Sequence, residues 1–106
     1  MSNHAAIIFD ALGDPTRRDI LGLLREGPQP VGRLADRLPV GRPNVSKHLR
    51  VLTEAGLVRH QRVGTRHLYA VAPEGLADAQ RWLVDLWDEA LRAFAVEVAE
   101  QELKQK

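Results

Sequence analysis

Apolar residues recur at helical spacing in the first third of the chain and predict three short helices. The expected helices cover residues 5–12, 15–25 and 31–38. Asp14 and Pro15 mark a helix start, because aspartate caps the free N–H groups of a first turn and proline fits the first helical position. The first helix is too apolar to stand alone in water, so we expect it to pack against another element.

The next predicted helix, residues 42–52, has two chemically different faces. At about 100° per residue, Val45, Leu49 and Leu52 fall in one apolar stripe. The opposite face carries Pro43, Ser46, Lys47 and Arg50. A compact turn at residues 39–41 joins this helix to the preceding one, as in a helix-turn-helix. One face can therefore dock on a core while the other enters a DNA major groove, which makes this a candidate recognition helix.

A glycine stop and a hairpin are expected after that helix. Gly56 suits the left-handed position that ends many helices. Two strand-length runs, residues 57–63 and 66–71, then flank the turn-prone pair Gly64-Thr65. Helix, glycine stop and hairpin in this order predict a winged helix.

The last third of the chain is expected to be one long helix. Residues 76–103 contain no Gly or Pro and are rich in Ala, Leu, Glu and Arg. Its apolar stripe is wider than one packing contact requires. The stripe consists of Trp82, Leu83, Leu86, Trp87, Ala90, Leu91, Phe94 and Val98. Part of it should face a second subunit, and its aromatic residues leave a ligand pocket at the subunit junction as an alternative.

Positive charge is concentrated in the predicted helix-turn-helix and hairpin. The net charge of the 106-residue chain is only +1. Residues 31–72, however, carry eight basic and two acidic residues, a net charge of +6, whereas residues 73–106 carry four basic and eight acidic residues, a net charge of −4. This distribution favours a nucleic-acid partner for the middle of the chain.

Composition excludes several other classes of function. The chain has no cysteine, which rules out disulfides, thiolate metal sites and thiol nucleophiles. Ser46 and His48 lie about 200° apart on their helix, and no phosphate loop or paired-carboxylate motif occurs, so we do not expect an enzyme. No signal peptide and no run of about 18 apolar residues is present, so we expect a cytoplasmic protein without a membrane partner.

Three histidines need their own interpretation. His48 lies at the edge of the apolar stripe of the recognition helix, where a packed and hydrogen-bonded ring is expected. His60 and His67 are candidates for cross-strand neighbours in the hairpin. Neither observation points to a metal ligand set.

Taken in order, four motifs resemble the ArsR family of small bacterial and archaeal repressors. They are residues 11–18 (ALGDPTRR), 45–52 (VSKHLRVL), 55–58 (AGLV) and 64–66 (GTR), with Tyr69 after the last. The resemblance covers nearly the whole chain. It implies a homodimer built by the N-terminal and C-terminal helices, two winged helices presented to a near-palindromic operator, and repression that a signal relieves.

The chain departs from the metal-sensing members of that family. Those proteins use Cys near the helix-turn-helix, or His and carboxylates on the last helix. Here there is no Cys, and the last helix has no His. Its acidic residues, Asp78, Asp85, Asp88 and Glu89, are typical of a solvated face. We therefore expect no metal and no cofactor, and the Trp-rich ending resembles a metal-independent branch of the family.

The resulting prediction is a single, mainly α-helical domain over residues 1–106 with a small antiparallel β-hairpin. Residues 1–13 and 73–104 form dimerisation helices, residues 31–55 the helix-turn-helix, and residues 57–72 the wing. The expected DNA contacts are Arg42, Pro43, Asn44, Ser46, Lys47, Arg50, Arg62, Thr65 and Arg66. The expected dimer interface consists of Ile7, Ile8, Phe9, Trp82, Leu83, Leu86, Trp87, Ala90 and Phe94.

Different roles are expected within the DNA-contacting set. Arg42, Asn44 and Ser46 near the helix start are candidates for base edges, whereas Lys47 and Arg50 are placed for phosphates. The predicted function is a dimeric repressor of its own or a neighbouring operon that binds an inverted-repeat operator. An activator and a winged-helix protein–protein module without DNA binding remain the alternatives, and a small-molecule or protein effector is left open.

Overall fold

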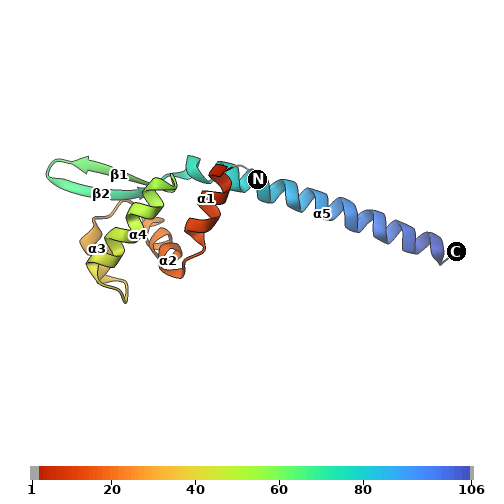
Figure 1. Cartoon of the computed structure of the whole chain (residues 1–106), viewed down its shortest axis with the longest axis horizontal. Coiled ribbons are helices and arrows are strands. Elements are labelled where there is room, and N and C mark those ends of the chain that lie inside the picture. Colours follow the sequence, from red (N-terminus) through yellow and green to blue (C-terminus); the bar gives the residue numbers. More distant parts are fainter. Residues whose placement is uncertain (1–2, 106) are drawn as a thin grey trace.

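A computed structural model of the chain, which describes residues 3–105, has a helical core, a two-stranded hairpin and one long projecting helix (Figure 1). The elements in order are α1 (Asn3–Leu12), α2 (Pro15–Leu24), α3 (Val31–Asp36), α4 (Arg42–Glu54), β1 (Val58–Val63), β2 (Arg66–Val71), the 3₁₀ helix η1 (Pro73–Leu76) and α5 (Ala77–Lys104). The molecule measures 72 × 25 × 22 Å because α5 extends far beyond the core. The predicted mainly α-helical fold with a small hairpin is confirmed.

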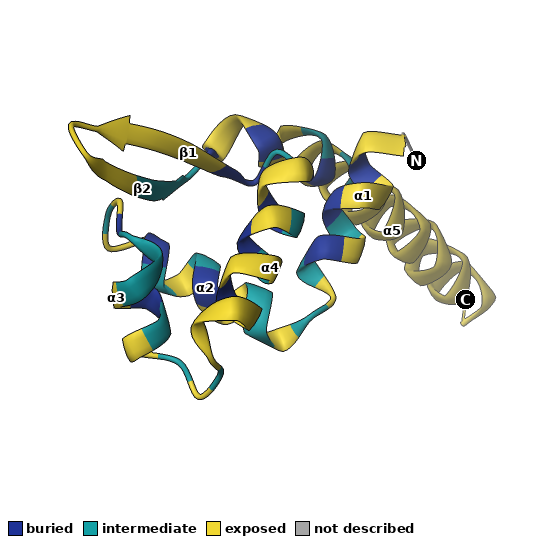
Figure 2. Cartoon of the chain, turned by 60° about the vertical axis from the view of Figure 1, so that its left-hand side comes forward, coloured by how far each residue is buried: buried dark blue, intermediate teal, exposed yellow. Residues whose placement is uncertain are grey.

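The core lies between the first four helices and the base of the hairpin (Figure 2). Val45, Leu49 and Leu52 of α4 have no exposed surface, which confirms the predicted apolar stripe. They pack with the buried residues Ile8, Ala11, Ile20, Leu24, Leu34, Ala55, Leu57, Val58 and Ala79. Each of the five α-helices therefore contributes to one core, while most of α5 lies outside it.

The start of α2 and the end of α4 are set by local hydrogen bonds, as predicted. The Asp14 carboxylate accepts a hydrogen bond from the Arg17 backbone N–H at 3.1 Å, so it caps α2. Gly56 has a φ of +79°. Its N–H donates to the Thr53 carbonyl, and the Leu57 N–H donates to the Leu52 carbonyl, both at 3.0 Å. These two bonds form a Schellman motif, which ends α4 and turns the chain into β1.

Helix α3 is shorter than predicted. It ends at Asp36 rather than at residue 38. The N–H groups of Arg37 and Leu38 donate to carbonyls three residues earlier, at 3.1 and 3.4 Å. A tighter turn of this kind often replaces the last turn of an α-helix, and here it leads into the link to α4.

The hairpin is antiparallel, and its register runs from Val58 opposite Val71 to Val63 opposite Arg66. A two-residue turn closes it, with Gly64 at a φ of +64°. In the middle of β2, the backbones of Tyr69 and Gln29 exchange two hydrogen bonds of 3.0 and 2.9 Å. The link between α2 and α3 thus anchors the hairpin to the helical core.

One residue of the predicted dimer interface is wrongly placed. Ile8 is fully buried within the chain's own core and has no surface to offer a second subunit. Its neighbours differ, since Ile7 is half exposed and Phe9 is partly buried. Helix α1 is apolar on most sides, so its pattern did not distinguish the core-facing isoleucine from the outward one.

Within residues 3–105, no helix combines the length and apolar character that a membrane span requires.

Gly75 in η1 lets the backbone of η1 approach the backbone of Gly56 closely, a contact that the sequence did not reveal. A Cβ atom at this position would overlap the Gly56 carbonyl oxygen and lie 2.6 Å from its carbonyl carbon. Because both atoms belong to the backbone at the end of α4, no side chain can move aside to make room. η1 therefore packs directly against the turn that connects α4 to β1.

We predict that Gly75→Ala lowers the free energy of unfolding by about 1–3 kcal/mol or more, because the methyl group must displace backbone. Urea denaturation at a fixed protein concentration measures the change. Gly22→Ala is the matched control, since a Cβ at Gly22 in α2 meets nothing within 4 Å and should stabilise by up to about 1 kcal/mol. Equal stability of Gly75→Ala and the wild type would contradict the close packing.

Candidate nucleic-acid interface

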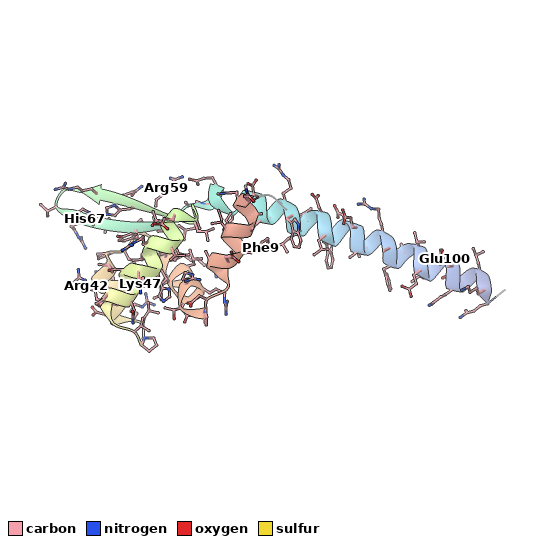
Figure 3. All side chains as sticks on the ribbon, viewed as in Figure 1. Phe9, Arg42, Lys47, Arg59, His67 and Glu100 are labelled. Atoms are coloured by element: carbon pink, nitrogen blue, oxygen red, sulfur yellow. The ribbon has the colours of Figure 1, made fainter. Side chains whose placement is uncertain are left out.

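Helix α4 presents one continuous polar face to solvent. We call this surface, formed by Arg42, Pro43, Asn44, Ser46, Lys47 and Arg50, the reading face. All six residues are exposed, whereas Val45 and Leu49 between them are fully buried. Figure 3 shows Arg42 and Lys47 along this helix, with Arg42 at the end nearer α3. All six predicted contact residues of α4 are thus exposed to solvent, away from the buried stripe.

Arg42 leans towards α3. The guanidinium lies over Gly32, where a Cβ would stand 3.8 Å from the Arg42 Nη1 atom. The absence of a side chain at Gly32 leaves room for the planar group. The side chain of Arg42, which is expected to reach a base edge, therefore lies against a neighbouring helix.

The positive charge of the reading face has no acidic partner. Two Arg side chains elsewhere are paired: Arg37 with Glu26 at 2.8 Å, and Arg59 with Glu74. Within residues 3–105, no ion pair involves Arg42, Lys47 or Arg50. Since unpaired surface cations attract a polyanion most strongly, this face is suited to phosphates.

The predicted contact residues of the hairpin lie at its tip, but not on one face. Arg62, Thr65 and Arg66 are all exposed. Arg62 stands opposite His67, and Arg66 stands opposite Val63. Because successive residues of a strand alternate between faces, Arg62 and Arg66 point to opposite sides of the hairpin. The two guanidinium groups therefore flank the tip, and Arg62 is held there by a bond from its Nε to the Gly64 carbonyl at 3.3 Å.

The histidines occupy the places that the sequence indicated. His60 and His67 are diagonal cross-strand neighbours, with Nε2 of the first 2.8 Å from Nδ1 of the second. Among residues 3–105, no cluster of three or more His, Cys, Asp or Glu residues is suited to hold a metal ion. His48 is half-buried and hydrogen-bonded, as expected.

Sequence reasoning missed a polar cluster beneath the reading face. Asp14, Arg17 and His48 lie together where α2 meets α4. The hydrogen bond from the backbone N–H of Arg17 lowers the pKa of the Asp14 carboxyl, and the charge of the Arg17 guanidinium acts in the same direction, whereas burial opposes the shift. Arg17 belongs to the motif at residues 11–18, but no spacing rule relates it to His48, 31 positions away.

An open apolar groove runs between α1 and α5, well away from the reading face. Its volume is about 860 Å³, and its walls include Phe9, Leu12, Leu83, Leu86, Trp87 and Ala90. Trp87 is 65% exposed and Phe94, further along α5, is 64% exposed. Side chains of this size are seldom left in water without a partner, so the surface is a candidate docking site.

Comparison with protein families places the middle of the chain in a known class of domain. The family model described as "Helix-turn-helix domain" matches residues 12–61. These residues include α2, α3, α4 and the first part of β1.

Two curated relatives are transcriptional regulators. The chain is 47% identical over 87 residues to the HTH-type transcriptional regulator Rv2034 of Mycobacterium tuberculosis (strain ATCC 25618 / H37Rv), covering 82% of this chain and 81% of that protein. It is 33% identical over 78 residues to the transcriptional repressor SdpR of Bacillus subtilis (strain 168), covering 74% and 87%.

Solved structures agree with the arrangement of elements. An ArsR-like transcriptional regulator from Rhodococcus sp. RHA1 superposes with a TM-score of 0.78 at 36% identity, covering 88% of each chain. The homodimeric winged helix-turn-helix DNA-binding domain of Mb0332 from Mycobacterium bovis superposes with a TM-score of 0.66 at 31% identity, covering 82% of this chain and 81% of that one. The chain belongs to the ArsR family of winged helix-turn-helix transcriptional regulators.

Proposed function

We propose that this regulator is a homodimeric repressor that binds an inverted-repeat operator and blocks transcription by occupying promoter DNA. The observation that carries the proposal is the reading face of α4, which is exposed and basic and has no acidic partner among the residues that the structure describes, while the opposite side is fully buried. The Bacillus subtilis relative is named a repressor, and the Mycobacterium bovis domain is a homodimer.

Each subunit would place α4 in a major groove. Arg42, Asn44 and Ser46 lie near the start of the helix, where recognition helices reach base edges. Lys47 and Arg50 lie further along and would bind phosphates, which position the protein without reading sequence. At the hairpin tip, Arg66 would approach the minor groove, whose negative potential attracts a guanidinium.

The second subunit would dock on the apolar surface of α1 and α5. The exposed stripe of α5 consists of Leu83, Trp87, Ala90, Leu91, Phe94 and Val98, which we call the dimer stripe. The spacing of the stripe residues is symmetric about the midpoint between Ala90 and Leu91, so that Trp87 and Phe94 lie equally far from it. Antiparallel pairing of two α5 helices would therefore set Trp87 against Phe94 of the partner subunit, so that the far half of each α5 fills the groove of the other chain.

The first test is selection of genomic DNA fragments by the purified protein at about 150 mM salt, followed by footprinting of the enriched fragments. We expect a protected inverted repeat with half-sites about one helical turn or a little more apart. No enrichment by an intact dimer would overturn the proposal and favour a protein–protein module.

Arg42 and Arg50 should differ in how they support binding. We predict that Arg50→Ala weakens binding to all DNA sequences and lowers the salt slope by about one, because one phosphate contact is lost. Arg42→Ala should relax base preference at one operator position, at a cost of about 1–3 kcal/mol. Titrations of operator variants at several salt concentrations measure both effects. An equal loss on every sequence from Arg42→Ala would remove its base-reading role.

Cysteine cross-linking tests the antiparallel pairing without background, because the chain has no cysteine. We predict that Trp87→Cys and Phe94→Cys, each alone, form little covalent dimer under mild oxidation, whereas the double variant forms it readily. Ala99→Cys, on the opposite side of α5 at helical spacing, is the control and should stay monomeric on non-reducing gels. Efficient cross-linking of each single variant with itself would indicate parallel helices instead.

A further inference from the structure

His48 of α4 is not part of the reading face and instead contacts residues at the start of α2. Its ring is half-buried, and its Nδ1 atom lies 3.4 Å from Nη1 of Arg17 and 4.0 Å from Oδ1 of Asp14. Because a guanidinium can only donate, Nδ1 must accept this hydrogen bond, and the ring then carries its proton on Nε2. The middle of α4 is thereby joined to the first turn of α2.

The same guanidinium also holds the end of α1. The Nε of Arg17 donates to the Ala11 carbonyl at 2.6 Å, and its Nη2 donates to the Asp10 carbonyl at 3.2 Å. Carbonyl groups in the last turn of a helix have no helical partner, and their partial negative charge favours a cation. One rigid planar group, carried by α2, therefore contacts α1 and α4 at once.

Helix α1 is in turn fixed to α5. The ring of Phe9 packs edge to face against Trp82, with 5.5 Å between ring centroids. Phe9 directly precedes Asp10, whose carbonyl Arg17 holds. The contacts consequently run from α5 through α1 and Arg17 to His48 on α4, and Figure 2 shows α1 between α5 and α4.

We propose that Arg17 is a positioning residue for operator recognition: it fixes the orientation of α4 relative to α1 and α5, and so the relative placement of the two reading faces in the dimer. This inference rests on the proposed function. Base-edge hydrogen bonds tolerate little displacement, whereas phosphate contacts tolerate more. Loss of the Arg17 contacts should therefore weaken operator binding and leave binding to unrelated DNA unchanged.

Arg17→Lys is the decisive variant because it keeps the charge but loses the planar fork that reaches three partners. We expect its operator affinity to fall by roughly five- to tenfold, the effect of about one net hydrogen bond, with an unchanged salt slope and unchanged affinity for unrelated duplex. Arg18→Lys is the matched control, since Arg18 donates from its side chain to the Leu12 carbonyl at 2.7 Å and has no bond to α4. It should bind operator as the wild type does.

A double-mutant cycle separates positioning from general loss of stability. His48→Phe keeps a ring but removes the acceptor, so it should reproduce the loss seen in Arg17→Lys. The two substitutions combined should cost no more than the worse single one, because they break the same contact. Circular dichroism shows whether Arg17→Lys folds. If it does not, the operator affinity of His48→Phe is compared with that of Arg18→Lys instead.

Two results would overturn the inference while leaving the proposed function intact. The first is wild-type operator selectivity in Arg17→Lys and His48→Phe. The second is an equal loss of affinity for operator and unrelated DNA, which would make Arg17 a phosphate contact or a general stabiliser. Failure of the wild type to bind any selected fragment would overturn the proposed function and the inference with it.

Discussion

Burial of one stripe of α4 is the constraint on which the rest of the structure depends. Val45, Leu49 and Leu52 have no exposed surface, and each stabilises the fold by about 1.5–3 kcal/mol on leaving water. Turning α4 about its axis would expose them and carry Lys47 or Arg50 towards the core, where an unpaired charge is costly. The reading face therefore points outward because its opposite side is committed to the core. No ligand is needed to hold it there.

A second constraint fixes the hairpin to that helix. The chain leaves α4 through a single left-handed glycine, and the Schellman bonds at Gly56 set the direction in which β1 departs. η1 packs on the same turn through Gly75, and the Gln29–Tyr69 bridge holds the middle of β2. A hairpin of two strands is marginal by itself in water. Here three attachments hold the half of the hairpin next to the helical core, and its tip projects away from that core (Figure 1).

These constraints differ in how visible they are in the sequence. The buried stripe of α4, the Asp14 cap and the Gly56 stop depend on residues within one or two turns of each other, and periodicity and capping rules predicted them. The role of Ile8 could not be predicted in the same way, because α1 is apolar on most sides and gives no single inward direction. Gly75 looks like any loop glycine until the Gly56 carbonyl is seen beside it. The Arg17–His48 contact spans 31 positions and exists only once α2 and α4 are packed together.

Positive and negative charge are concentrated in different parts of the molecule. Residues 31–72, which hold the reading face and the hairpin, carry a net charge of +6, whereas residues 73–106, mostly α5, carry −4. Because α5 extends away from the core, the opposite charges are separated along the longest axis of the chain. A polyanion attracts one end of such a molecule and repels the other, which orients the approach before any contact forms. The near-neutral total of +1 therefore hides a strongly polar molecule. An acidic α5 also keeps the apolar dimer stripe away from phosphates, so that the surface proposed for a second copy and the surface proposed for DNA do not compete.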